Sequence, residues 1–192
     1  MLSARKNLLM IAVFGSLLMA CKKDETSSPT PTPPNEEELI TTLILTFTDQ
    51  ETPTEIFELR FTDLDGDGGN APVITGDTLP ANRAYNLSLR VLNESGSTPE
   101  EITNEIEEEG TAHQFFFQPV ATTLLVTYAD ADANGQPIGL ANLATTAAPG
   151  EGTITVTLRH EPNKTAAGVI NGDITNAGGE TDIEVTFPVI VD

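Results

Sequence analysis

The sequence has a single cysteine, no tryptophan and few basic residues. With Cys21 alone the chain cannot form an internal disulfide, so an apolar core has to supply its stability. Nine Lys and Arg stand against 29 Asp and Glu, a formal net charge of −20, which excludes nucleic acid as a partner on electrostatic grounds. A run of ~18 apolar residues, the length needed to span a bilayer, is also missing.

The first 20 residues have the features of an export signal. Arg5 and Lys6 form a positive n-region, and the apolar stretch LLMIAVFGSLL (8–18) follows it. The letters LMAC, which end at Cys21, resemble a bacterial lipobox, where cleavage precedes a cysteine that becomes lipid-modified. We therefore predict a lipoprotein signal peptide at 1–20 and lipidation of Cys21, which anchors the protein to a membrane that it does not span. The alternative is an ordinary secretory signal with a stray cysteine.

The residues after the anchor indicate where the protein is sent. CKKDE (21–25) resembles the export signal of Bacteroidetes lipoproteins, in which a lysine and two acidic residues after the cysteine direct the protein to the cell surface. TSSPTPTPPNEEE (26–38) contains almost nothing apolar, and its prolines favour extended conformations. Residues 21–38 are therefore predicted to be a disordered tether, and the protein to be lipid-anchored at the outer membrane, facing the cell surface.

Residues 39–192 are numerous enough for one domain with a sizeable core, and their main pattern has a period of two. In EIFELRFT (55–62), for example, Phe57, Leu59 and Phe61 share one face of a strand. Clusters of Gly, Asn and Asp separate such runs. The strand-like runs are 41–48, 55–62, 84–93, 112–119, 122–130, 153–160 and 182–191.

One helix is predicted, PEEITNEIEEE (99–109). Pro99 and acidic residues occupy its first turn, Ile102 and Ile106 lie one turn apart, and Gly110 follows its end. These elements together predict an all-β fold, an immunoglobulin-like antiparallel β-sandwich of seven to eight strands with one short helix. A small β-barrel is the alternative.

An acidic loop, DLDGDGG, resembles the start of a calcium site. It places Asp63, Asp65 and Asp67 at alternate positions, so that their carboxylates can converge on one cation. It is not an EF-hand, because Ile74 stands where the bidentate Glu belongs and no helices flank the loop. Asp77, or a carbonyl of a neighbouring loop, would have to supply the missing ligands.

A second acidic loop, DADANG, repeats the pattern with Asp130, Asp132 and Asn134. It fails the same EF-hand test, since the position of the closing Glu holds Ala141. Both loops also have a simpler interpretation, because Asp, Asn and Gly are the residues that hairpin turns prefer. Calcium is therefore the cofactor that the acidic loops suggest, and turn formation is the competing hypothesis.

The two histidines are candidates for a transition-metal site. His113 and His160 each end a predicted strand, and two imidazoles with a carboxylate such as Glu161 would suit zinc, copper or haem iron. The competing interpretation is a pair of surface or hydrogen-bonded histidines.

Signatures of catalysis are missing. Ser88, Ser95 and Ser97 lack the context of a nucleophile elbow, and no acid pair stands out for glycoside hydrolysis. Within the FFF run, Phe116 faces away from its two neighbours and is predicted to be an edge contact or a partner-binding residue. An enzyme is not expected.

Five stretches of the domain, taken in combination, are the basis of a resemblance to a known family. They are DLDGDGGNAPV (63–73), HQFFF (113–117), VTYADADANG (126–135), LRHEPNK (158–164) and NAGGETDIEVTFPV (176–189). In this combination the chain resembles a family of small Bacteroidetes surface or outer-membrane lipoproteins of unknown function. Some members carry the label of a type 1 periplasmic-binding fold, a two-lobed α/β structure that one helix and alternating strands do not support. The family implies no activity and no catalytic residues.

Two functions remain as hypotheses. The first is a lipid-anchored, non-catalytic binding or interaction module at the outer membrane or cell surface, accessory to an outer-membrane receptor or transporter. The second is a protein that binds calcium, another metal or a small ligand through the acidic loops or the two histidines. Residues 39–192 hold 24 acids and five bases, which suits a cation or a basic partner and also simple solubility.

Overall fold

The computed structural model describes residues 39–66 and 68–192. The predicted signal peptide, Cys21, the tether and Asp67 lie outside these residues. The helical elements are α1 (Thr103–Glu108), η1 (Val169–Asn171) and η2 (Ile174–Asn176). The strands are β1 (Thr42–Asp49), β2 (Ile56–Thr62), β3 (Val73–Gly76), β4 (Ala84–Asn93), β5 (Glu100–Glu101), β6 (His113–Val120), β7 (Leu125–Tyr128), β8 (Ala141–Thr145), β9 (Gly150–His160) and β10 (Glu180–Val191).

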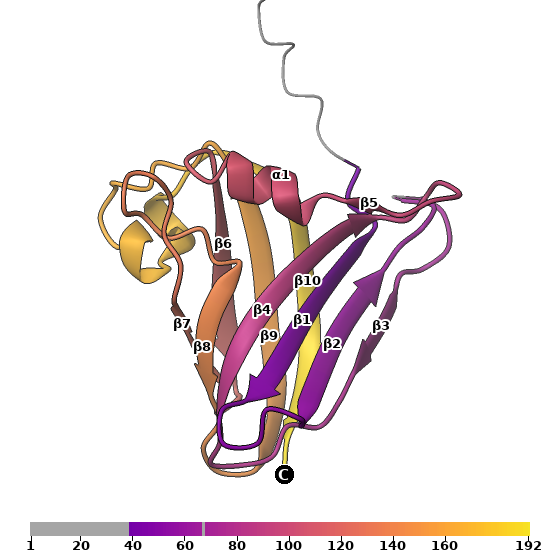
Figure 1. Ribbon diagram of the computed structural model, residues 1–192, viewed down its shortest axis with the longest axis vertical. Helices are drawn as coiled ribbons and strands as arrows, with labels where there is room; N and C mark the ends of the chain where they lie inside the picture. The colour runs from indigo at the N-terminus through magenta and orange to yellow at the C-terminus, as the bar shows by residue number, and fades with distance from the viewer. Residues whose placement is uncertain (1–38, 67) are drawn as a thin grey trace, which may run out of the picture. The chain divides into compact units, whose positions relative to one another are not determined.

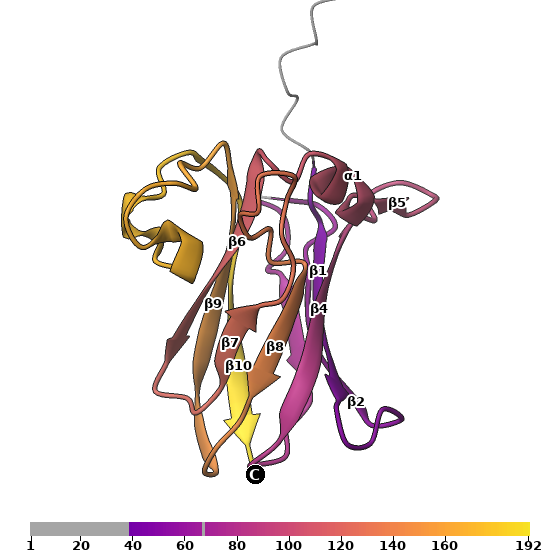
Figure 2. The ribbon, with the colours of Figure 1, turned by 60° about the vertical axis from the view of Figure 1, so that its left-hand side comes forward.

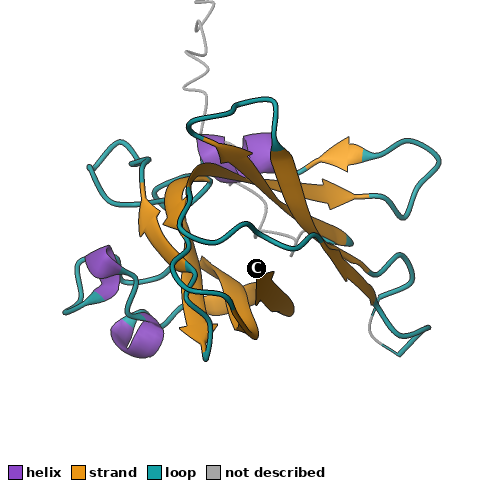
Figure 3. Ribbon diagram, turned by 90° about the horizontal axis from the view of Figure 1, so that it is seen from below, coloured by secondary structure: helices purple, strands orange, loops and turns teal. Residues whose placement is uncertain are grey.

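The strands form two antiparallel sheets that lie face to face (Figures 1 and 3). Sheet A has seven strands in the order β3-β2-β1-β4-β8-β7, with β5 paired to β4, and sheet B has the order β10-β9-β6. The predicted all-β antiparallel sandwich is therefore confirmed, and the alternative of a barrel is not adopted. No helix among the described residues is long and apolar enough to cross a membrane.

All seven predicted runs form strands, but the predicted total of seven to eight is too low. The strands β3, β5 and β8 were not predicted. The immunoglobulin-like detail is not confirmed, since immunoglobulin domains order their strands A-B-E-D and C-F-G. Here β3-β2-β1-β4 has instead the order of a Greek key within one sheet.

The two sides of the sandwich differ. On one side the chain after β3 runs along the outer edge of β10, where the Leu79 N–H donates to Ile190 (2.9 Å) and the Asp192 N–H donates to Leu79 (3.1 Å). On the other side the outermost strands are β6 of sheet B and β7 of sheet A. The candidate site described below lies on this second side.

The core consists of the inward faces of both sheets, as the period of two predicts. Phe47, Tyr85, Phe115 and Phe187 are fully buried and are the largest of these side chains. Tyr85 contacts Phe47 edge to face, with 5.9 Å between ring centroids, and its hydroxyl donates to Pro80 at 3.1 Å. Full burial of an apolar side chain of this size contributes about 1.5–3 kcal/mol.

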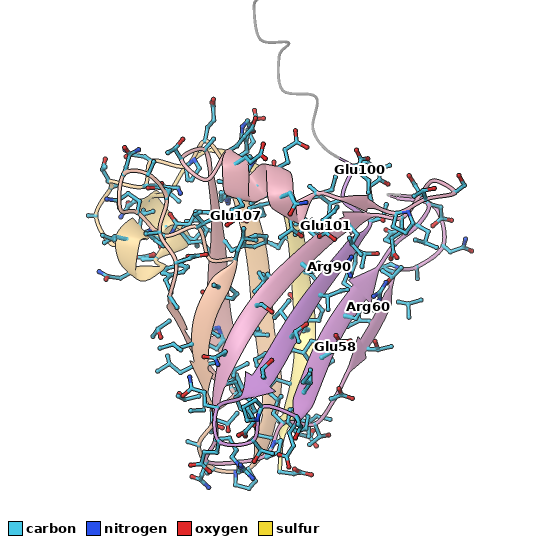
Figure 4. The ribbon with its side chains drawn as sticks, viewed as in Figure 1. Glu58, Arg60, Arg90, Glu100, Glu101 and Glu107 are labelled. Carbon is cyan, nitrogen blue, oxygen red and sulfur yellow. The ribbon has the colours of Figure 1, made fainter. Side chains whose placement is uncertain are left out.

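The outward face of sheet A carries paired charges (Figure 4). Arg60 and Arg90 flank Ile44 in register, and Ile44 is buried at this face. Arg60 pairs with Glu94 and Arg90 with Glu101, each at 2.7 Å. An arginine side chain combines an apolar stem with a charged head. The stems of Arg60 and Arg90 therefore cover Ile44, while their guanidinium groups remain in water.

The helix α1 lies within the predicted segment 99–109 and covers six of its residues, so the predicted short helix is present. Its apolar side is the predicted one, because Ile102 and Ile106 are both buried. No basic residue lies in its last turn and Glu109 caps it, so the charges oppose the helix dipole. Near the start of the predicted helix, Glu100 and Glu101 form the short strand β5 instead.

Residues 161–179, with η1 and η2, lie against the outward face of sheet B (Figure 2). Phe116 is fully buried there in a small second core with Val169 and Ala177. The prediction of Phe116 as an edge contact or partner-binding residue is therefore wrong. The outward position was correct, but this segment of the same chain covers it.

Candidate functional site

The first acidic loop is organised as a turn. Asp63 accepts a hydrogen bond from the Gly66 N–H (3.0 Å), and Asp65 accepts from the backbone (3.0 Å) and side-chain (2.6 Å) N–H groups of Asn70. These bonds from Asn70 lower the pKa of Asp65. The described part of this loop therefore shows the local hydrogen bonding that Asp and Asn supply in turns.

Asp77 lies at the other end of β3 from this loop. Its N–H donates to the Glu58 carbonyl, and its carboxylate accepts from the Glu58 N–H, both at 2.9 Å. Strand β3 has four residues, and a strand rises ~3.3 Å per residue, so about 13 Å of strand separates Asp77 from the loop. Asp77 is not brought to Asp63 and Asp65. Calcium binding by the first loop stays a prediction, which would need Asp67 and carbonyl oxygens.

In the second acidic loop, Asp130 binds the backbone. One carboxylate oxygen accepts from the N–H groups of Ile138 (3.2 Å) and Gly139 (2.8 Å), and the other accepts from Ala141 (2.8 Å). Three N–H donors thus hold this carboxylate and close the loop between β7 and β8.

Asp132 is engaged in the same way. One oxygen accepts from the N–H groups of Asn134 (2.8 Å) and Gln136 (3.0 Å), and the other contacts the Lys164 ammonium at 3.0 Å. Burial raises the pKa of Asp132, but the hydrogen bonds from Gln136 and Lys164 outweigh it, and the net shift is downward. All four carboxylate oxygens of Asp130 and Asp132 are therefore already hydrogen-bonded. The cation beside this loop is the chain's own ammonium group.

Lys164 is buried together with its partners. Its side chain is 5% exposed and that of Asp132 is 1% exposed. The ammonium group also donates to the carbonyls of Gly110 and Pro137 (2.9 Å). Burial lowers the pKa of Lys164, and Asp132 opposes this shift. Three acceptors satisfy its three protons, so calcium at this loop would have to displace a lysine that is fully hydrogen-bonded.

The two histidines do meet. His113 and His160 are register partners on β6 and β9, and their rings stack with 5.0 Å between centroids and 27° between planes. His113 Nδ1 lies 3.3 Å from the Glu109 carbonyl, and Nε2 lies 3.9 Å from Asp182. Burial lowers the pKa of His113, and the neighbouring His160 adds to the shift.

This stacking does not favour a shared metal. Ring nitrogens bind a metal in the plane of their ring, so two nearly parallel rings do not converge on one ion. Across residues 39–66 and 68–192, no three His, Cys, Asp or Glu side chains lie together in a group that could hold a metal ion. The transition-metal hypothesis stays a prediction without a third ligand in the described chain.

A groove lies on the open side of the sandwich, beside strand β7. Its volume is about 420 Å³, within the range of ligand sites. None of the side chains that line it is charged. We name it the β6–β7 groove, and its lining residues are Phe117, Val126, Thr127, Tyr128, Ile170, Asn171 and Gly172.

Hydrogen bonds hold the Tyr128 side chain in place in the β6–β7 groove. Its hydroxyl donates to the Phe115 carbonyl (2.6 Å) and accepts from the Gln114 amide (3.2 Å), which also donates to Val169 (3.0 Å). Burial raises the pKa of Tyr128 to about 12, so the hydroxyl stays neutral. Gly172 has φ +87°, and a Cβ there would lie 3.4 Å from the Tyr128 hydroxyl. That distance is an ordinary van der Waals contact, so it is the positive φ that favours glycine at this position beside Tyr128.

A second hollow, of about 480 Å³, lies between α1 and the second acidic loop. Acidic residues line it, including Glu107, Asp130 and Asp132. The two aspartates are already bonded to backbone N–H groups and Lys164, so this hollow is less suited to a ligand than the β6–β7 groove.

The sequence did not reveal the β6–β7 groove or Lys164. Phe117 and Tyr128 lie in the strand-like runs 112–119 and 122–130, which do not mark them as parts of one site, and no motif singles out Ile170. One signal was available for Lys164, because it is the only lysine in residues 39–192. No protein-family model, curated protein or solved structure matches this chain.

Proposed function

We propose that the protein is a lipid-anchored, non-catalytic interaction module at the outer membrane, facing the cell surface, and that it holds its partner in the β6–β7 groove. The observation that carries this proposal is the groove itself. It is concave and uncharged, and its walls are strand residues and the η1 turn, with Tyr128 held in place by hydrogen bonds to Phe115 and Gln114. Binding sites need such rigid support.

The lining of the groove supports binding over catalysis. A catalytic pocket needs a nucleophile, a general acid or base, or a metal at the reacting atoms. The groove presents aromatic, aliphatic, hydroxyl and amide groups, and its one ionisable group, Tyr128, is held neutral. The ionisable groups with unusual surroundings, His113 and Lys164, are buried against other parts of the chain.

The location of the protein is supported by the sequence alone. The apolar segment ending at Cys21, the CKKDE signal and the proline-rich residues 26–38 are the features of a tethered surface lipoprotein. Such a tether would leave the domain free to meet an outer-membrane receptor or transporter. An interaction module of this kind requires no activity of its own.

Three measurements test the proposal. Cells fed a labelled fatty acid should label the wild-type chain and not Cys21→Ser, and protease added to intact cells should digest the wild type. A photo-reactive amino acid at position 170, in the groove, should cross-link one outer-membrane protein. The same group at position 190 should not, although Ile170 and Ile190 are similarly exposed, at 48% and 44%. Equal cross-linking at both positions, or an unlabelled wild type, would contradict the proposal.

A further inference from the structure

We propose that the β6–β7 groove takes an extended peptide segment of a partner protein, added as a strand to the free edge of β7. The segment has an uncharged, apolar centre and basic flanks. This inference rests on the proposed function and names the chemistry of the partner. It follows from the outward-facing backbone of β7, from the uncharged lining with its aromatic and aliphatic side chains, and from the charge of the domain.

The free edge of β7 presents backbone groups to the groove. The Ala129 N–H donates to Ala141 at 2.9 Å, so these two residues form a hydrogen-bonded pair of the β7–β8 ladder. Hydrogen-bonded and non-hydrogen-bonded pairs alternate along an antiparallel ladder. Tyr128 and Val126 therefore direct their N–H and C=O groups away from β8, and both residues line the groove.

Strand β6 also has backbone groups that point away from its partner strand, β9. The Phe115 N–H donates to Ile138 at 2.7 Å, so the N–H of Phe115 points away from β9. By the same alternation, Phe117 also directs its backbone away from β9. Between described residues, no hydrogen bond uses the outward backbone groups of Phe117, Val126 or Tyr128. Strand β7, with two outward-facing residues, thus offers a partner strand what an exposed sheet edge offers in β-augmentation, and Phe117 of β6 contributes to the lining of the groove.

The side chains of the groove fit one face of an added strand. Phe117 and Tyr128 pack against each other, with 6.1 Å between ring centroids, and Ile170 is 48% exposed in the lining. Alternate side chains of a strand point to the same face, so every second residue of the partner would meet these apolar groups. Strand β7 has four residues, which offer about 13 Å of edge.

Charge complementarity selects among peptides. The lining carries no charged side chain, so a charged centre would lose its hydration without gaining a partner. The domain as a whole, residues 39–192, carries 24 acids against five bases, a net negative field that attracts basic flanks and repels acidic ones. The β6–β7 groove therefore selects an apolar extended segment with lysine or arginine at its ends.

The test uses the full chain and a labelled probe peptide of alternating valine and threonine with two lysines at each end. Fluorescence anisotropy should report binding. N-methylation of every second residue removes the N–H groups on one edge of the peptide, and methylation of the intervening residues removes those on the other edge. One methylated series should weaken binding at least tenfold, and the other should leave it within about twofold, since only one edge of the peptide pairs with β7.

Three protein variants complete the test. Val126→Pro removes an N–H that the β7–β8 ladder does not use, and Ile170→Asp places a charge in the lining. Both should weaken binding at least tenfold. Ile190→Asp makes the same change on β10, away from the groove, and should have no effect. If Val126→Pro does not fold, Ile170→Asp against Ile190→Asp still decides the matter.

The inference fails if the peptide does not bind at millimolar concentration, if both methylated series weaken it equally, or if glutamate flanks bind as well as lysine flanks. Peptide binding that Ile170→Asp leaves intact would also overturn it. A partner cross-linked at position 170 without peptide binding would leave the proposed function standing and remove the added strand. Peptide binding without any cross-linked partner on cells would do the reverse.

Discussion

Lys164 stays charged inside the protein because three oxygen atoms accept its three ammonium protons. They come from Asp132, from Gly110 after α1 and from Pro137 in the loop before β8. One side chain thus joins residues 161–179 to two segments that are distant in sequence. An isolated ammonium would not remain charged in such a place, but here each proton has an acceptor.

Lys164→Met should reduce the free energy of unfolding by about 3–5 kcal/mol, since it leaves the buried Asp132 carboxylate without its cation. Urea unfolding measures this loss. The matched control is Arg90→Met, whose partner Glu101 lies with it at the surface and whose loss should be below about 1 kcal/mol. Similar losses in the two variants would show that the buried pair contributes no more to the free energy of unfolding than the surface pair does.

His113 should make the protein less stable in acid. Its pKa is lowered in the folded state by burial and by His160, and the unfolded value is about 6.5. Between these two pKa values the unfolded chain binds more protons, so the free energy of unfolding falls as pH drops below about 6.5. It levels off below the folded pKa. The carbonyl and the carboxylate of Glu109 oppose this downward shift in the pKa of His113, and Lys164 adds to it. The Asp182 carboxylate also faces the ring, 3.9 Å from Nε2.

Urea unfolding between pH 5 and 8 checks this expectation, with His113→Gln as the comparison. The variant should lose the part of the pH dependence that belongs to the imidazole, whatever its absolute stability. An unchanged slope in the variant would assign the acid sensitivity to other groups.

At the scale of elements, period-two patterns found the strands that bury a side chain at every second position. Strand β10 shows this most clearly, with alternate residues buried along most of its length. The strand β3 escaped notice because all four of its residues are exposed. The strand β8 escaped because alanines and a threonine fill most of its five positions, and only pairing with β4 and β7 reveals it.

The site was less predictable than the fold, for a physical reason. The β6–β7 groove combines Phe117, Val126–Tyr128 and Ile170–Gly172, three segments that only the tertiary structure brings together. The acidic loops were visible because their residues are adjacent in sequence. What adjacency could not show is that backbone N–H groups and Lys164 occupy the oxygens of Asp130 and Asp132.

The loop between β7 and β8 allows a matched test of packing. Gly135 and Gly139 both have positive φ, +76° and +89°, but a Cβ at Gly139 would lie 2.9 Å from Phe115 and one at Gly135 would meet nothing within 4 Å. Gly135→Ala should therefore cost about 1–2 kcal/mol from backbone strain alone. Gly139→Ala should cost about 1–3 kcal/mol more, because it overpacks the core. Equal losses in urea unfolding would show that the Phe115 contact relaxes freely.

At the scale of the molecule, the excess of acids over bases in residues 39–192 makes the domain repel itself. Raising NaCl from about 0.01 M to about 0.15 M shortens the Debye length from about 30 Å to about 8 Å. The thermal midpoint should therefore rise with salt. A midpoint that stays flat or falls would mean that the surface ion pairs, which salt weakens, outweigh the general repulsion.

The same melt separates this general effect from a calcium site. We expect calcium and magnesium to raise the midpoint equally at equal ionic strength, because Asp130 and Asp132 are already bonded and Asp77 lies beyond β3 from the first loop. A specific site at 100 times its dissociation constant would add about 2.7 kcal/mol, or roughly 5–10 °C for a domain of this size. An extra shift of that size in calcium alone, lost in Asp65→Ala, would establish the first acidic loop as a calcium site. Its missing ligands would then have to come from Asp67 and neighbouring carbonyls.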